Sequence, residues 1–167
     1  MINQDIEHLI GQMAVELKSR LCSLSRADPV MIGIHTGGTW VASHLHRQLE
    51  LDEPLGELNI AFYRDDFSRI GIHPRVTPSN LPFEIDNKHI ILVDDVLHTG
   101  RTIRAALNEI FDYGRPASVI LAVLVERSGR ELPIQADIVG KSMTLNNNDH
   151  VKLSGPEPLA LVIKKSA

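Results

Sequence analysis

Three nearly unbroken runs of apolar residues constrain the fold more than any other feature of this sequence. They cover residues 30–34, 89–93 and 119–125, and the first two lead into a glycine-containing turn and then into apolar residues at helical spacing. Strands without polar alternation are typical of parallel sheets, because helices cover both faces of such a sheet. The pattern therefore predicts an α/β fold with a central, mainly parallel sheet flanked by helices.

Weaker patterns complete the expected layout. Apolar spacing predicts a helix over residues 4–22, lying on the core or on a partner. Further strands are expected at 58–63, 137–139 and 159–163. The sequence contains no internal repeat, low-complexity segment or interdomain linker, so its 167 residues predict a single domain, 1–167.

Composition argues against several classes of protein. The formal net charge is -4, whereas a chain that mainly grips a nucleic-acid backbone is usually basic. No stretch approaches the roughly 18 consecutive apolar residues of a membrane-spanning helix. The one cysteine, Cys22, allows no internal disulfide and fits a cytoplasmic location, and its apolar surroundings predict a buried, inert thiol.

The strongest functional signal follows the run at 89–93. Two carboxylates, Asp94 and Asp95, are expected at the end of this strand, where open α/β sheets bind ligands. A tight turn at 97–102 then leads into a helix over 103–111, so backbone N–H groups and a helix N-terminus favour an anion there. Acids that merely cap a helix are the alternative. The complete pattern is more specific, and it predicts a phosphate cradle beside two carboxylates suited to ribose hydroxyls.

These residues resemble the signature with which type I phosphoribosyltransferases bind phosphoribosyl pyrophosphate (PRPP). The resemblance implies that Asp94 and Asp95 are catalytic, because they position the ribose close to the positive charge that develops on it. It also implies that the following loop binds the 5-phosphate. The substrate-binding residues implied in this loop are Val96, Leu97, His98, Thr99, Gly100, Arg101 and Thr102.

Most of the chain, roughly residues 3–163, is similar to one branch, the pyrimidine operon regulator/uracil phosphoribosyltransferase family. The resemblance implies a glycosyltransferase of pyrimidine salvage, which moves ribose 5-phosphate from PRPP to uracil and yields UMP and pyrophosphate. It implies Mg²⁺ carried by PRPP, with no metal ligated directly by the protein. Hypoxanthine, guanine or xanthine are the alternative bases, and a homodimer or larger homo-oligomer is expected. The similar segments are 62–66, 114–116, 121–126, 130–134, 136–137 and 140–141.

The turn at Thr36, Gly37 and Gly38 matches the pyrophosphate loop of the family. Adjacent glycines let a backbone approach an anion closely and present N–H groups to it. Familiar members of the branch carry arginine where this chain has Gly37. The missing charge is therefore expected from the segment that follows the strand at 58–63. The candidate residues there are Arg64, Arg69 and Arg75.

Two further segments are expected to surround the site. Residues 64–84 are charged and proline-rich, which is typical of a lid or binding loop, although a hairpin with a flexible tip is compatible with the same pattern. The resemblance makes this segment a flexible lid that excludes water during the reaction. It also implies a small hood over the base at about 127–158, with Arg127 as a candidate for base binding.

The alternative function is an RNA-binding transcriptional attenuator that senses UMP or UTP, with little or no catalysis. RNA-binding members of the family carry Thr, Arg and His where this chain has residues 10–15, and the late segment 144–149 lacks Arg and Lys. Together with the net charge, these differences argue against the same mode of RNA binding. A catalytically inactive nucleotide sensor is a third hypothesis, against which the intact Asp94–Asp95 pair argues.

Overall fold

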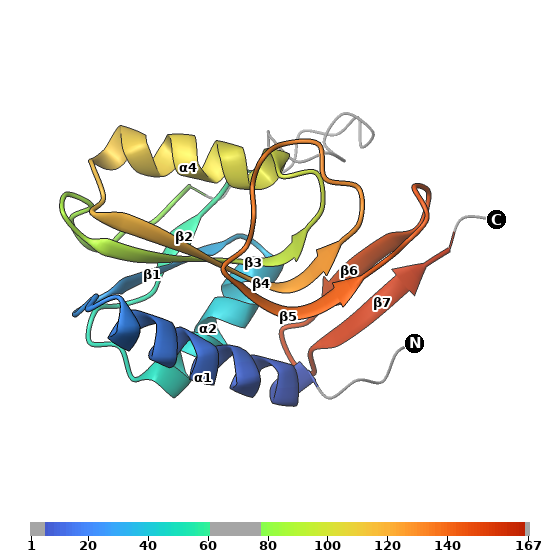
Figure 1. Ribbon diagram of the computed structural model, residues 1–167, viewed down its shortest axis with the longest axis horizontal. Coiled ribbons are helices and arrows are strands. Elements are labelled where there is room, and N and C mark those ends of the chain that lie inside the picture. The colour runs from blue at the N-terminus through green and yellow to red at the C-terminus, as the bar shows by residue number, and fades with distance from the viewer. Residues whose placement is uncertain (1–5, 61–77, 166–167) are drawn as a thin grey trace.

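A five-stranded parallel sheet forms the centre of the computed structural model, which describes residues 6–60 and 78–165. The strand order is β2-β1-β3-β4-β5, and every pair in it is parallel (Figure 1). The predicted α/β fold with a mainly parallel sheet is confirmed. The strands are β1 (Val30–Ile34), β2 (Gly56–Leu58), β3 (His89–Leu97), β4 (Ser118–Arg127) and β5 (Ile138–Met143).

Helices cover both faces of this sheet, with α1 (Ile6–Ser23) and α2 (Gly37–Leu49) on one face and α4 (Arg101–Tyr113) on the other (Figure 1). Successive side chains of a strand point to opposite faces. Accordingly, Ile91 and Val93 of β3 join the core layer of α1 and α2, whereas Ile90 and Leu92 join the layer of α4. Burial on both faces explains why the strands are continuous apolar runs. The fully buried side chains of α1 are those of Ile10, Met13 and Leu17.

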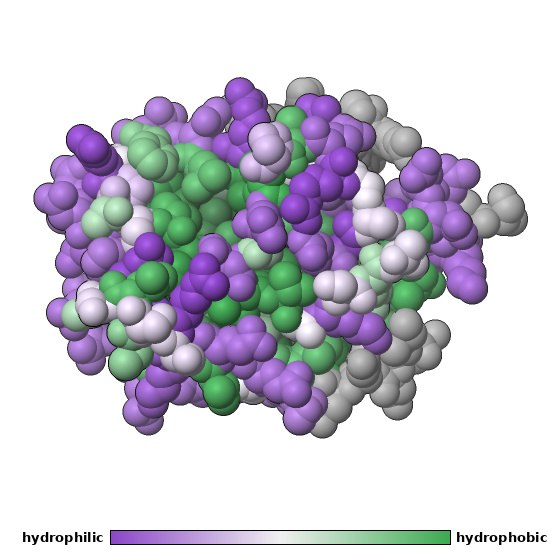
Figure 2. Space-filling model, viewed as in Figure 1, coloured by the Kyte–Doolittle hydropathy of each residue, from purple (hydrophilic) through white to green (hydrophobic). Residues whose placement is uncertain are grey.

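The first helix therefore packs on its own sheet. Its apolar stripe belongs to the core of the same chain, so this stripe is not free to bind a partner. The expected homo-oligomer stays a prediction and needs another surface. Figure 2 shows hydrophobic residues gathered on the side of the molecule where α4 and the start of β4 lie. Leu107, Val119 and Val139 are partly buried residues that pack against the core layer of α4.

The central strand is longer than predicted. Asp94 pairs with Val123 and Leu97 pairs with Glu126, so β3 continues through the two carboxylates to Leu97. Polarity suggested an end at residue 93, but backbone pairing with β4 continues regardless of the side chains that the strand carries. The carboxylates consequently sit in an ordered strand, and α4 begins at Arg101, two residues before the expected start.

A two-stranded antiparallel hairpin lies beside the sheet. It consists of β6 (His150–Ser154) and β7 (Ala160–Lys164), and its buried Leu153 and Leu161 join the layer of α1 and α2. We call residues 150–164 the hairpin. The strand expected at 159–163 corresponds to β7, whereas β6 was not predicted. The range expected for the hood also contains β5, which pairs with β4 in the main sheet.

Two smaller expectations meet a different outcome, and a third agrees with the structure. The strand expected at 58–63 is β2 at 56–58, and residues 61–63 lie outside the described part of the chain. Cys22 is exposed rather than buried, because it lies on the outward side of the last turn of α1. Neither described stretch contains a helix that is long and apolar enough to cross a membrane.

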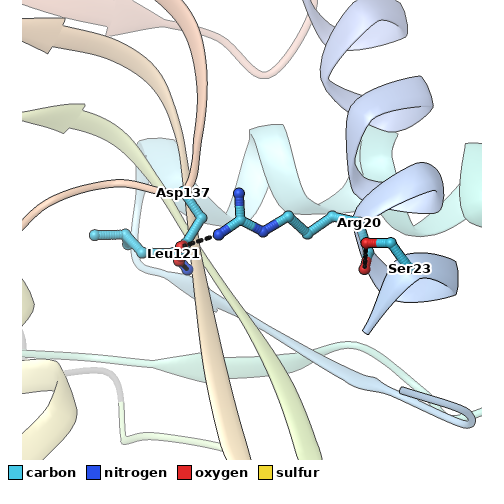
Figure 3. A network of polar contacts seen from close by, with 4 residues as sticks. All are labelled: Arg20, Ser23, Leu121 and Asp137. Carbon is cyan, nitrogen blue, oxygen red and sulfur yellow. Dashed lines mark hydrogen bonds and ion pairs between the residues drawn. The ribbon is translucent and has the colours of Figure 1, made fainter. Parts of the chain in front are cut away.

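Asp137 links three elements through its two carboxylate oxygens (Figure 3). One oxygen accepts a hydrogen bond from the backbone N–H of Leu121 in β4 at 2.9 Å, and the other accepts one from the Arg20 guanidinium of α1 at 3.1 Å. The Asp137 N–H donates to the Leu121 carbonyl at 2.8 Å. This residue therefore ties the entry of β5 to β4 and to the end of the first helix.

We expect Asp137→Ala to lower the free energy of unfolding by about 1–3 kcal/mol, because the Leu121 N–H loses its acceptor. Asp137→Asn retains one acceptor oxygen and should cost less. Arg20→Ala should cost about 1 kcal/mol or less, since this ion pair is solvent-exposed. Equilibrium unfolding in urea measures all three. Equal losses for Arg20→Ala and Asp137→Ala would show that the ion pair, and not the backbone bond, dominates.

Candidate functional site

A cavity of about 830 Å³ lies at the carboxyl end of β3. The segments that line it come from the end of β3, the turn into α4, the start of α2, and the hairpin with the loop before it. The structure thus brings together the carboxylates, the phosphate turn and the pyrophosphate turn singled out in the sequence. The predicted residues along its wall are Thr36, Gly37, Asp94, Asp95, Val96, Leu97, His98, Thr99, Gly100, Thr102 and Arg127.

The start of α2 approaches the two carboxylates at very short range. A β-carbon placed on Gly38 would lie 2.7 Å from the Val93 carbonyl oxygen and 3.0 Å from the Asp94 Cα atom. A β-carbon placed on Gly37 would overlap the carboxylate of Asp95. Only glycine allows this approach, which brings the N-terminus of α2 to the cavity. An arginine side chain at position 37 would displace Asp95 from its present position.

The two carboxylates are oriented by the backbone around them. Asp94 is 1% exposed, and its Oδ1 accepts the N–H of Asp95 at 2.9 Å. The Oδ1 of Asp95 accepts the N–H of Val96 at 2.9 Å. An ionised carboxylate has about four lone-pair positions, so these bonds fix the groups without exhausting their capacity to accept hydrogen bonds. Both residues line the cavity, where hydroxyl groups of a ligand can donate to them.

The turn into α4 forms the second helix N-terminus at the cavity. Gly100 precedes the helix with a φ of 95°, a conformation that favours glycine. The buried Thr99 accepts the Arg101 N–H on its hydroxyl at 3.2 Å. Its carbonyl accepts the N–H groups of Glu131 and Leu132, each at 3.0 Å. These bonds hold the turn in place, so its N–H groups and the helix N-terminus can bind an anion.

The side chains of Arg101 and His98 take different directions from this turn. The Arg101 guanidinium pairs with the Glu131 carboxylate at 2.8 Å and is not among the residues that line the cavity. Any contact of Arg101 with a phosphate therefore falls to its backbone. His98 does line the cavity, and it packs so closely on Gly129 that a β-carbon there would lie 2.8 Å from its Nε2 atom.

Arg127 is committed to holding the loop that precedes the hairpin. It is 4% exposed, and its guanidinium donates to the carbonyl oxygens of Asp149 at 2.5 Å, Asn146 at 3.1 Å and Ser128 at 3.3 Å. Three carbonyl partners occupy much of its donor capacity. The structure therefore favours a role in positioning this loop over the direct binding of a base that the sequence suggested.

Several cavity residues were not singled out individually in the sequence. No motif marks them, and the only available signal was the positive charge of two lysines near the end of the chain. Arg64, Arg69 and Arg75, the expected cationic residues, lie outside the described ranges, as do residues 64–77 of the expected lid. Six further wall residues fall within the expected hood at about 127–158, namely Asn147, Asn148, His150, Val151, Lys152 and Leu153. The wall residues outside every predicted site segment are Trp40, Ile103 and Lys164.

The arrangement suits a ligand with two anionic ends and hydroxyl groups between them. Each helix N-terminus is equivalent to roughly half a positive charge. The N-cap residues Thr36 and Gly100 make no side-chain cap bond, whereas the Thr99 hydroxyl accepts the N–H of Arg101, the first residue of α4. The carboxylates of Asp94 and Asp95 lie in the same cavity, where they select for hydroxyl donors.

Comparison with known proteins points to one family. The sequence matches the phosphoribosyl transferase domain family over residues 2–157. It is 61% identical over 165 residues to the Bifunctional protein PyrR of Nitrosococcus oceani, covering 98% of this chain and 93% of that protein. It is 57% identical over 153 residues to the Bifunctional protein PyrR of Pseudomonas aeruginosa, covering 92% of this chain and 90% of that protein.

Solved structures of low sequence identity share the fold. The hypoxanthine phosphoribosyltransferase of Staphylococcus aureus superposes with a TM-score of 0.62 at 22% identity, over 82% of this chain and 74% of that one. The hypoxanthine phosphoribosyl transferase of Trypanosoma cruzi gives 0.65 at 21% identity, over 84% and 74%. At this level of identity, the likeness supports the architecture alone.

We expect Gly38→Ala to lower the free energy of unfolding by about 1–3 kcal/mol, because the new methyl group collides with the backbone of β3. Gly11→Ala is the matched control, since a β-carbon at Gly11 in α1 has its nearest neighbour at 4.0 Å. That change should raise stability by about 0.5–1 kcal/mol. Urea unfolding of both variants measures the difference, and an unaffected Gly38→Ala protein would refute the tight contact.

Proposed function

Because the chain belongs to the phosphoribosyl transferase family, in its PyrR branch, we propose that it is a uracil phosphoribosyltransferase. It transfers ribose 5-phosphate from PRPP to uracil and releases UMP and pyrophosphate. The observation that carries the proposal is the cavity in which Asp94 and Asp95 lie with two helix N-termini. PRPP has the matching chemistry, since its ribose hydroxyls separate a phosphate from a pyrophosphate.

The 5-phosphate binds at the turn into α4. Backbone N–H groups of this turn and the hydroxyls of Thr99 and Thr102 serve as its donors, and the helix N-terminus adds positive potential. The ribose hydroxyls donate to Asp94 and Asp95. Neighbouring backbone N–H groups orient the carboxylates of Asp94 and Asp95. The oriented carboxylates hold the sugar in one geometry, which reduces the entropic cost of reaching the transition state.

Bond cleavage at the anomeric carbon leaves positive charge on the ribose. The carboxylates of Asp94 and Asp95 stabilise this charge because they are already fixed beside the sugar. Asp95 is a partly buried carboxylate on the cavity wall, and its negative charge favours a cation nearby, so an Mg²⁺ ion that PRPP carries would fit the cavity without a direct protein ligand. When bound, Mg²⁺ offsets the negative charge of the departing pyrophosphate.

Uracil is assigned from the PyrR branch, because the solved neighbours support the fold alone. The base enters below the loop at 146–149, which Arg127 holds against the end of β4. Backbone carbonyl and N–H groups in this region suit the amide-like edge of uracil. Arg127 contributes by positioning that backbone.

A turnover assay with PRPP, Mg²⁺ and each nucleobase in turn tests the proposal. We expect nucleoside monophosphate to form with uracil and not with hypoxanthine, guanine or xanthine. Formation of a purine nucleotide alone would move the chain to another specificity within the same family. Absence of product with every base would reject catalysis and favour a nucleotide-binding regulator.

Asp95→Asn should reduce turnover by about 100-fold or more, because the amide is neutral where positive charge develops. Asp112→Asn is the control, since Asp112 lies exposed on α4 and away from the cavity. Initial rates at saturating PRPP measure the effect, and circular dichroism checks the fold. An Asp95→Asn enzyme as fast as the parent would show that the carboxylate does not serve the ribose.

A second candidate function is RNA-binding regulation of pyrimidine genes. The relatives are named bifunctional, which favours a second activity besides transfer. The exposed part of α1 between residues 10 and 15 presents the neutral Gln12 and Val15, so this surface offers an RNA backbone no cation. Regulation through RNA would need another surface of the chain.

A gel-shift titration with a pyrimidine leader RNA, with and without UMP, tests this second function. A UMP-dependent shift that survives 150 mM salt would support it, because specific binding outlasts the loss of weak phosphate contacts. A shift that disappears at this salt, or no shift at all, would reject it and leave transfer as the function of the chain.

A further inference from the structure

We infer that Lys152 and Lys164 of the hairpin bind the pyrophosphate group of PRPP, and so supply the cations that the glycine loop at Thr36–Gly38 lacks. The inference rests on the proposed function, because PRPP is the ligand that brings a pyrophosphate to this cavity. It assigns a role in substrate binding to residues that carry no sequence motif. Three observations on the hairpin support it.

The first observation is that the turn of the hairpin packs beside the start of α2. Trp40, in the first turn of α2, packs on the connection between β6 and β7, and a β-carbon on Gly155 would lie 2.8 Å from its ring. The α4 end has a different wall, where a β-carbon on Gly100 would lie 3.3 Å from Leu132 and 3.4 Å from Ile134. The turn of the hairpin therefore adjoins the start of α2, and Lys152 lies three residues before Gly155. Lys164 pairs with His150 at the other end of the hairpin and reaches the same cavity from there. The 5-phosphate turn lies against another segment.

The second observation is that the basic residues share one face of the hairpin. His150 pairs directly with Lys164 across the two strands, and Lys152 follows two residues later on the same side of β6. The opposite side carries Leu153 and Leu161, which are buried in the core. The leucines thus fix which side faces outward, and all three basic residues line the cavity.

The third observation concerns the partners of these lysines. Within residues 6–60 and 78–165, the side chains of Lys152 and Lys164 form no hydrogen bond or ion pair, and both residues are exposed. Besides the two lysines, Arg127 is the permanently charged basic residue of the cavity wall, and its guanidinium already donates hydrogen bonds to three carbonyl oxygens. Two unpaired ammonium groups on the same face repel each other, and an anion between them removes this cost.

The need for these cations follows from the start of α2. Gly37 carries no side chain, so the loop offers a pyrophosphate backbone N–H groups and the helix N-terminus but no cationic side chain. The carboxylates of Asp94 and Asp95 add negative charge nearby. Lysine suits the task because its ammonium group is a compact charge on a flexible stem, which can follow pyrophosphate as it leaves.

Calorimetric titration of the full chain with pyrophosphate, and separately with inorganic phosphate and UMP, in buffer containing Mg²⁺, tests the inference. We expect Lys152→Gln and Lys164→Gln each to raise the Kd for pyrophosphate about fivefold, and the double variant to raise it further. The Kd for UMP should change less than twofold, because its phosphate binds at the other end of the cavity. Lys152→Arg should restore pyrophosphate binding.

Lys165→Gln is the matched control, because Lys165 is the neighbour of Lys164 and does not line the cavity. Its Kd values should equal those of the parent. A Kd for pyrophosphate that is unchanged in the double variant would overturn the inference. An equal rise for UMP or for inorganic phosphate would also overturn it, since the lysines would then act as a general anion surface.

The same titrations separate failure of this inference from failure of the proposed function. A parent chain that binds pyrophosphate through both lysines and forms no UMP supports the pyrophosphate site and rejects catalysis. If the parent chain forms UMP and its KM for PRPP equals that of the double variant, the proposed function stands and the role of the lysines is rejected. A parent chain that does not bind pyrophosphate rejects the inference outright.

Discussion

The close contact between the start of α2 and the end of β3 is the constraint on which the rest of this site depends. Gly38 touches the backbone of Val93 and Asp94, and Gly37 leaves no space beside the carboxylate of Asp95. This contact brings a helix N-terminus to two carboxylates, a combination that neither element provides alone. Because Gly37 carries no side chain, cationic side chains for an anionic ligand must come from another part of the fold.

Hydrogen bonds from one arginine and the burial of two leucines hold the opposite wall of the cavity in place. Arg127 binds three backbone carbonyls, and Leu153 and Leu161 anchor the hairpin in the core of α1 and α2. A buried guanidinium with several carbonyl partners fixes a loop that has little regular structure of its own. The cavity consequently has one wall of strand ends and helix N-termini, and one wall that a single arginine and two leucines keep in place.

Sequence reasoning succeeded where the determinants are local. The carboxylates and the phosphate turn are neighbours in the chain, so their pattern was recognisable before the fold was known. It failed where backbone pairing or a distant partner decides. Strand β3 continues through Asp94 because β4 pairs with it, and the side chain of Arg101 leaves the cavity because Glu131 attracts it. The strand β6 carries too few apolar residues to be recognised without its partner β7.

The sequence by itself determined the α/β class, the central strands of the sheet, and the paired carboxylates beside a glycine-containing turn. Each follows from the hydrophobic pattern or the chemistry of adjacent residues, which act over a few positions of the chain. Only the tertiary structure decided which cations reach the cavity. Lys152 and Lys164 come to its wall because β6 and β7 pair and dock on the core, and Arg127 turns to the loop because three carbonyls meet there. Such contacts depend on packing between distant segments, which no local pattern records.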